Sequence, residues 1–140
     1  MGEITPATAV EIDKLAFIFI KDKKILSSRT RGRSVWYIPG GKREKGENDM
    51  EALEREIKEE LNINLVLPSM RYIGVFKAQA DSHLPGVIVK MTCYSGQYEG
   101  EPHPASEIAE IAYLTYSDKT KSSPVDQLIF EALYNSGSII

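Results

Sequence analysis

The chain is poor in the residues that build disulfide frameworks and membrane spans. Cys93 is its one cysteine, so an internal disulfide and a cysteine-rich zinc site are excluded. A lone cysteine fits a reducing compartment, and we therefore expect a cytoplasmic protein. The longest purely apolar run, 15–20, is far shorter than the roughly 20 residues that cross a bilayer. Since no long apolar stretch follows a basic segment near the start, we expect no secretory signal.

Internal repeats, low-complexity tracts and long linkers are also missing, which argues against repeat and collagen-like architectures. The length of 140 residues predicts one domain, over 1–140. Hydrophobic residues make up 42% and charged residues 26%, which is typical of a globular protein with one core.

Charge is unevenly distributed along the chain, although the net charge is only −3. Segment 21–45 carries nine basic residues against two acids, and segment 47–62 carries seven acids against two basic residues. Adjacent blocks of opposite sign suit an anionic ligand that is bound through a divalent metal. The alternative is a pair of solvated surfaces, which is what most charge runs are.

The pattern of apolar residues predicts strands, then a helix, more strands and a second helix. We expect strands over 14–20, 25–29, 35–38, 64–67, 71–80, 86–96 and 108–115, and helices over 48–61 and 124–134. Pro39-Gly40-Gly41 reads as a turn that ends the third strand. This order predicts an α/β or α+β sandwich with a mixed sheet.

The first helix has clear end signals. Asn48 and Glu51 match a capping box, and Asn62 suits a left-handed terminator. Its core-facing residues are predicted from their helical spacing: Met50, Leu53, Ile57 and Leu61. For the second helix we expect Ser122 or Ser123 near the start, and an apolar side made of Val125, Leu128, Ile129, Ala132 and Leu133.

A second stripe on the first helix is acidic. At about 100° per residue, Glu56, Glu59 and Glu60 fall side by side next to the buried stripe. Carboxylates so placed repel one another, and a hard divalent cation relieves the repulsion. The preceding Gly-Gly pair lets the backbone approach a ligand closely. The alternative is a glutamate-rich surface helix.

The spacing over 41–63 resembles the Nudix box, the motif of the Nudix hydrolases. The matching positions are Gly41, Glu47, Arg55-Glu56-Ile57, Glu59-Glu60, Leu61 and Ile63. The one departure is Asn62, where the family has glycine, and asparagine is the next most tolerant residue of a positive φ.

The resemblance implies an α/β/α sandwich with a mixed central sheet. It also implies hydrolysis of a nucleoside diphosphate linked to another group, with Mg²⁺ or Mn²⁺ as cofactor. The family's roles fall on this chain as follows. Glu56, Glu59 and Glu60 would be metal ligands with the Gly41 carbonyl, Glu56 or Glu59 the general base, and Arg55 the residue that orients carboxylates, paired with Glu47.

Further candidates bind substrate. Arginine is suited to a bidentate grip on phosphate, so the basic candidates are Arg29, Arg31, Arg33 and Lys42. Trp36 or Tyr37 could stack on a nucleobase or belong to the core. The family often adds an acid from a later loop, for which Glu107 ranks before Asp81. His83 and His103 read mainly as surface residues, and Cys93 as a buried, inert thiol.

The substrate is predicted mostly by elimination. The proline that the resemblance associates with ADP-ribose would fall near Gln79, and no proline stands there. The tyrosine associated with dinucleoside polyphosphates is missing from 76–80, and so is the coenzyme A motif. A MutT-like nucleoside triphosphate pyrophosphohydrolase is the leading hypothesis. Hydrolases of ADP-ribose, nucleotide sugars or dinucleoside polyphosphates are alternatives, as is a non-catalytic nucleotide-binding module.

The expected partner is a small-molecule nucleotide, with neither a membrane nor nucleic acid involved. An isopentenyl diphosphate isomerase, which shares the box, would need a catalytic cysteine, and Cys93 lies in an apolar strand pattern. The sequence does not indicate the oligomeric state, and a homodimer is one of the possibilities.

Overall fold

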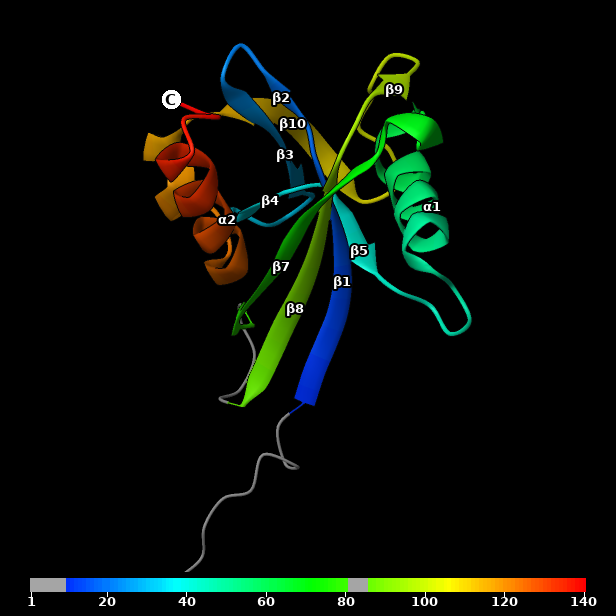
Figure 1. The fold of residues 1–140 in the computed structure, drawn as a ribbon, viewed down its shortest axis with the longest axis horizontal. Coiled ribbons are helices and arrows are strands. Elements are labelled where there is room, and N and C mark those ends of the chain that lie inside the picture. The colour runs from blue at the N-terminus through cyan, green and yellow to red at the C-terminus, as the bar shows by residue number, and fades with distance from the viewer. Residues whose placement is uncertain (1–9, 81–85) are drawn as a thin grey trace, which may run out of the picture.

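A computed structural model describes residues 10–80 and 86–140. Its larger sheet has the strand order β5-β1-β8-β7. The strands are β1 (Val10–Ile18), β5 (Gly40–Lys42), β7 (Arg71–Gln79) and β8 (Val87–Ser95). β1 runs parallel to β8, whereas the β1–β5 and β7–β8 pairs are antiparallel. The predicted mixed sheet is thereby confirmed (Figure 1).

A second sheet has the order β10-β3-β2, and β4 also pairs with β3. These strands are β2 (Ile20–Lys21), β3 (Lys24–Thr30), β4 (Trp36–Tyr37) and β10 (Ile108–Leu114). Two short strands, β6 (Asn64–Leu65) and β9 (Tyr98–Glu99), form a separate pair. The described residues also include the 3₁₀ helices η2 (Leu67–Ser69) and η3 (Tyr116–Lys121).

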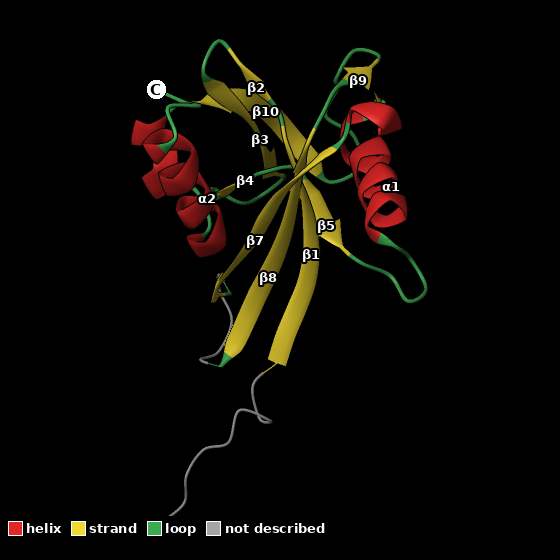
Figure 2. Ribbon diagram, viewed as in Figure 1, coloured by secondary structure: helices red, strands yellow, loops and turns green. Residues whose placement is uncertain are grey.

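The two α-helices, α1 (Asp49–Leu61) and α2 (Pro124–Asn135), lie on opposite sides of the strands (Figure 2). Successive side chains of β1 point alternately toward α1 and toward α2, because the side chains of a strand alternate between its two faces. Leu15 and Phe17 join the core cluster under α1, and Ala16 and Ile18 join the cluster under α2. The expected sandwich, with a mixed sheet between helices, is therefore the fold.

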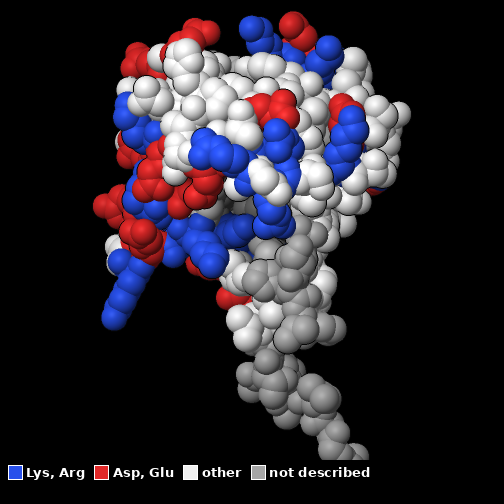
Figure 3. All heavy atoms as spheres, turned by 180° about the vertical axis from the view of Figure 1, so that it is seen from behind, with Lys and Arg blue, Asp and Glu red and all other residues white. Residues whose placement is uncertain are grey.

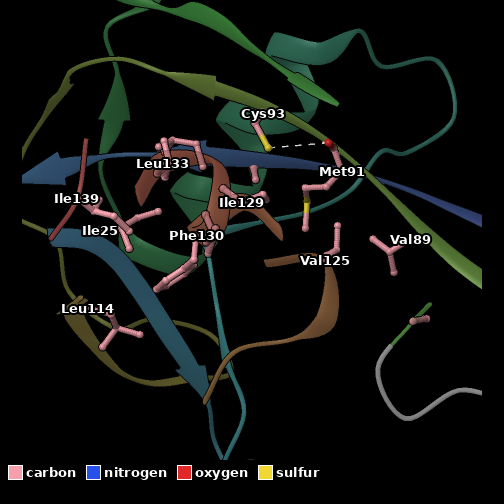
Figure 4. Packing of buried hydrophobic residues seen from close by; sticks show 14 residues of the cluster. Ile25, Val89, Met91, Cys93, Leu114, Val125, Ile129, Phe130, Leu133 and Ile139 are labelled. Atoms are coloured by element: carbon pink, nitrogen blue, oxygen red, sulfur yellow. Dashed lines mark hydrogen bonds between the residues drawn. The ribbon is translucent and has the colours of Figure 1, made fainter. Parts of the chain in front are cut away.

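The cluster under α2 is shown in Figure 4. Ile129, Phe130 and Leu133 of α2 pack with Met91 and Cys93 of β8. The second helix does begin near Ser123, which is its N-cap. Its predicted apolar side was partly wrong, because the buried face is made of Val125, Asp126, Ile129, Phe130 and Leu133. Leu128 and Ala132 are exposed.

The predicted turn at Gly40-Gly41 was wrong. These residues form β5 and pair with Leu15 and Ala16 of β1. The chain leaves the smaller sheet at Tyr37 and enters the larger one at Gly40. The strand predicted over 14–20 likewise starts earlier and is interrupted, since β1 ends at Ile18 and β2 begins at Ile20.

The end signals of α1 are confirmed. Asn48 accepts from the Glu51 backbone N–H at 2.8 Å, and the Glu51 carboxylate accepts from the Asn48 N–H at 2.9 Å. Asn62 ends the helix in the left-handed region, with φ 56° and ψ 39°. Neither α1 nor α2 is long and apolar enough to span a membrane, and no other helix in the described ranges is.

Candidate active site

A cavity of about 620 Å³ opens between α1, β5 and the smaller sheet. Its acidic lining residues are Glu44, Glu56, Glu60 and Glu107, and its basic ones are Lys14, Arg33, Lys42 and Arg43. The backbone of Gly40 and Gly41 and the ring of Tyr37 also line it. Acidic and basic side chains also alternate on the part of the surface that carries α1, seen from behind in Figure 3.

The two glycines of β5 allow a close approach between the strand and α1. The Gly40 N–H donates to Glu60 Oε1 at 3.2 Å. Gly40 has φ 149°, and a Cβ there would overlap the Leu15 carbonyl. A Cβ on Gly41 would overlap the Glu56 carboxylate. Glycine is thus required at Gly40, where φ is positive and the obstacle is backbone, whereas at Gly41 the overlap is with the end of a flexible side chain.

Glu60 and Glu56 form a partly buried acidic pair at the wall of the cavity. Burial raises the pKa of Glu60 to about 8, the Gly40 N–H opposes that rise, and the negative charges of Glu56 and Glu107 add to it. Burial also raises the pKa of Glu56, against the lowering effect of Arg55. Burial therefore disfavours the charged form of both carboxyls, and a bound cation would favour it.

Arg55 lies behind this pair and holds several groups at once. Its Nε and Nη2 donate to the two carboxylate oxygens of Glu47 at 2.7 and 2.9 Å. Its Nη1 donates to Glu56 at 2.8 Å and to Glu59 at 3.4 Å, and Nη2 also reaches the Lys42 carbonyl at 3.0 Å. The predicted ion pair with Glu47 is present, and the Arg55 guanidinium lowers the Glu47 pKa to about 2.

A second ionic network fixes the loop that leads into α1. Arg43 donates from Nε to Asp13 at 2.9 Å and pairs through Nη2 with Asp49 at 2.7 Å. Tyr94 of β8 donates to Asp49 at 2.5 Å. These contacts tie the start of α1 to two strands of the larger sheet. The sequence did not predict them, because Arg43 and Asp13 are far apart in the chain.

The structure brings together many of the predicted site residues. Those that line the cavity are Arg33, Tyr37, Gly41, Lys42, Glu56, Glu60 and Glu107. Glu59 lies outside the lining, with 53% of its side chain exposed. Lys14, which the sequence did not single out, lines the cavity and lies 5.8 Å above the Tyr37 ring.

The remaining candidates lie elsewhere. Arg29 pairs with Glu110 at 2.7 Å, and Arg31 donates to the Ser106 carbonyl at 3.3 Å. Neither lines the cavity, because each is held by a neighbouring strand or loop. Trp36 packs against the core cluster under α2, which favours the core role left open for it.

The other titratable candidates add little to the site. Cys93 is buried as predicted, and burial raises the pKa of its thiol to about 12. His103 is exposed. Asp81 and His83 lie outside the described residues.

A smaller cavity of about 220 Å³ adjoins the first. The two share a common border of Lys14, Arg33, Tyr37, Lys42 and Met91. Beyond that border the smaller cavity is lined mainly by apolar residues: Ile12, Ala80, Val89, Pro124 and Val125, with Gln79 and Ser123 as polar members. The basic residues thus lie between the acidic pair and the smaller cavity.

The donor set at the acidic end fits a divalent cation. Glu56 and Glu60 offer carboxylate oxygens, which hard cations prefer, and burial raises the pKa of each. In the described parts of the chain, no three acidic, histidine or cysteine side chains already converge as a ligand group. Glu59 is engaged by Arg55 and would have to leave it to join the other two.

Comparison with known proteins agrees with this geometry. A family model described as the NUDIX domain matches residues 13–132. The chain belongs to the Nudix family. This Nudix chain is 27% identical over 97 residues to an uncharacterized Nudix hydrolase, YvcI, of Bacillus subtilis (strain 168). That alignment covers 69% of the chain, and the chain spans only 61% of the relative's length.

Solved structures share the Nudix fold. The solution structure of the E. coli ORF135 protein matches with a TM-score of 0.69 and 23% identity, over 96% of this chain and 94% of that one. The MutT protein from Methanosarcina mazei Go1 matches with a TM-score of 0.73 and 19% identity, over 92% and 96% of the two chains. At such identities the likeness establishes the fold alone.

Proposed function

We propose that the protein is a divalent-metal-dependent hydrolase that cleaves the diphosphate linkage of a nucleoside diphosphate joined to another group. The observation that carries this proposal is the arrangement of charge in the main cavity. Glu56 and Glu60 line the main cavity but not the smaller one. Lys14 and Lys42 line both and so lie at their common border. A metal-bound diphosphate needs acids on the metal side and bases beside the phosphates.

The reaction depends on positioning and charge neutralisation more than on covalent chemistry. Bound Mg²⁺ or Mn²⁺ would neutralise the diphosphate and activate the attacking water. In this proposal Glu56, Glu59 and Glu60 hold the ion, together with the Gly41 carbonyl. Lys14 and Lys42 attract the phosphates.

The chain's own residues prepare the acids for these roles. Arg55 fixes the orientation of Glu56 through the 2.8 Å hydrogen bond, and Glu47 holds Arg55 from the other side. Proton acceptance from water is assigned to Glu56 or Glu59. Separate glutamine variants of the two are compared at saturating metal, because each also loses a ligand oxygen and only the loss of the base leaves turnover low under that condition.

The leading substrate is a nucleoside triphosphate. In support, the smaller cavity is about a third as large as the main cavity, which suits one ring system. Tyr37 lines both cavities and offers a face for stacking. Hydrolysis of ADP-ribose, nucleotide sugars or dinucleoside polyphosphates is the alternative that the experiment below separates.

The test is turnover of a substrate panel with Mg²⁺, followed by chromatography of the products. The panel holds nucleoside triphosphates, ADP-ribose, NADH, nucleotide sugars and dinucleoside polyphosphates. Glu60→Gln keeps an oxygen that can accept from Gly40 but loses the charge, so turnover is expected to vanish while the fold persists. Glu54→Gln is the matched control, since Glu54 lies on the same helix outside the cavity.

Each outcome has a clear meaning. Monophosphate and pyrophosphate from triphosphates, absent with Glu60→Gln, support the proposal. Products from ADP-ribose or a sugar nucleotide alone keep the reaction and overturn the substrate. Nucleotide binding without any turnover favours the binding module. Unchanged turnover in Glu60→Gln overturns the assignment of that residue as a metal ligand.

Two further expectations belong to the same proposal. A cytoplasmic location rests on the composition, with its single cysteine. The partner is taken to be a small nucleotide, and homodimer formation stays open to measurement by light scattering.

A further inference from the structure

Asp126 is a fully buried carboxylic acid, and burial of an ionisable group is energetically unfavourable. It lies in the first turn of α2 and has no exposed surface. No salt bridge is found for it among the described residues, and its Oδ1 has no hydrogen-bond partner there. Its Oδ2 accepts the Ile38 backbone N–H at 2.9 Å. Burial of a polar group is tolerated when the group forms a hydrogen bond with another buried polar group. For Asp126 that partner is the Ile38 N–H.

Ile38 lies in the segment that crosses from one sheet to the other. β4 ends at Tyr37 and β5 starts at Gly40, so Ile38 has no strand partner for its N–H. Pro39 has no N–H to donate, and its carbonyl accepts from Phe17 at 2.9 Å. Without Asp126 the Ile38 N–H would lose its acceptor at a buried position, which is unfavourable.

The same segment borders the acidic pair two residues later. Gly40 donates to Glu60 at 3.2 Å, and the Gly41 backbone lies against the Glu56 carboxylate. The start of α2 also holds the segment from the other end, since the Ser123 N–H donates to the Trp36 carbonyl at 3.3 Å. Hydrogen bonds therefore connect the start of α2 to residues 36–38, and the next residues of the same segment contact Glu60 and Glu56.

We propose that Asp126 is a positioning residue of this site. By fixing residues 38–41 it sets where the Gly40 N–H and the Gly41 backbone meet Glu60 and Glu56, without touching metal or substrate itself. The inference rests on the proposed function for its effect on turnover, but its effect on metal binding is measured separately.

The experiment compares three variants. Asp126→Ala removes the acceptor, Asp126→Asn keeps an oxygen that can accept from Ile38, and Ile129→Ala weakens the same buried face of α2 without removing a hydrogen-bond acceptor. Mn²⁺ binding without nucleotide is followed by electron paramagnetic resonance, below the unfolding temperature of each variant. Partners that orient metal ligands typically contribute 10–100-fold to affinity.

We expect Asp126→Ala to weaken Mn²⁺ binding about tenfold. Asp126→Asn is expected to restore most of that affinity, and Ile129→Ala to bind as the unaltered protein does. The proposal is overturned if Asp126→Ala binds Mn²⁺ normally, or if Ile129→Ala weakens binding as much. If Asp126→Ala does not fold, Asp126→Ser replaces it, because its hydroxyl is too short to reach Ile38.

Turnover is read in parallel, with the Mg²⁺ concentration for half-maximal rate as the variable. That concentration is expected to rise about tenfold in Asp126→Ala, with little change in the KM for nucleotide at saturating metal. If the unaltered protein binds Mn²⁺ but cleaves nothing, the proposed function fails while the Mn²⁺ comparison still decides the role of Asp126.

Discussion

Replacing Asp126 with asparagine is expected to change how the stability of the fold depends on pH. Burial raises the pKa of Asp126 from 3.8 to about 7, against the lowering effects of the Ile38 N–H and the positive charge of Lys14. The folded protein therefore keeps a proton on Asp126 at pH values where the unfolded chain has released it. Stability from this residue is full below pH 4 and is lost as the pH rises toward 7.

The size of the effect follows from the pKa difference. About three units, at 1.36 kcal/mol each, give about 4 kcal/mol lost between pH 4 and pH 8. An asparagine side chain is neutral throughout, so the Asp126→Asn variant lacks this loss. The free energy of unfolding of the variant minus that of the unaltered protein is expected to rise by about 4 kcal/mol over the interval.

The measurement is urea unfolding followed by circular dichroism at several pH values, with a chelator present. Lys14 on β1 and Cys93 on β8 are the titratable groups that face Asp126, and the raised pKa of the Cys93 thiol keeps it neutral throughout. Glu60 titrates in the same interval but is common to both proteins, so it cancels. Two parallel stability curves would refute the reasoning, because Asp126 would then not change charge between pH 4 and 8.

Substitutions at three further positions test the geometry of the site. Asn62→Gly is expected to fold and act normally, whereas Asn62→Ala loses about 1 kcal/mol in urea unfolding because its φ is positive; equal stability of the two would contradict this. Gly40→Ala is expected to lose at least about 2 kcal/mol, since its Cβ meets the Leu15 carbonyl, and an unchanged melting temperature would count against that overlap. Arg55→Lys cannot hold both oxygens of Glu47, so kcat/KM is expected to fall about tenfold or more; unaltered kinetics would show that the bidentate pair is dispensable.

Helix α1 was predictable because its signals are local. The Asn48–Glu51 capping box and the left-handed Asn62 are determined within a few residues. The spacing of Glu56 and Glu60 likewise places them one turn apart on one helix. Family recognition from this segment was confirmed by the match over 13–132.

Strand β5 was not predictable in the same way. Glycine has little preference for strands, and Gly40–Lys42 is a strand only because β1 lies beside it. Pairing of that kind depends on tertiary structure, so a Pro-Gly-Gly sequence read locally indicates a turn.

The residues around the site also depend on tertiary contacts. Asp126 looked like an ordinary acid in the first turn of a helix, which dipole arguments favour. Its burial follows from which face of α2 meets the larger sheet, and helical spacing alone favoured a face that included Leu128. Within the basic block, Arg29 and Lys42 look alike in sequence, yet Arg29 is paired with Glu110 and Lys42 lines the cavity.

The parallel pairing of β1 with β8 has a consequence for how the chain folds. The register joins Val10 to Val87 and Ile18 to Ser95, so contacting residues are about 77 positions apart. A protein dominated by such distant pairings searches longer for its native topology. β1 also carries β5, and α2 supplies the acceptor for Ile38. A nascent chain that has emerged from the ribosome only as far as α1 therefore holds every acid of the box, but not the framework that aligns them.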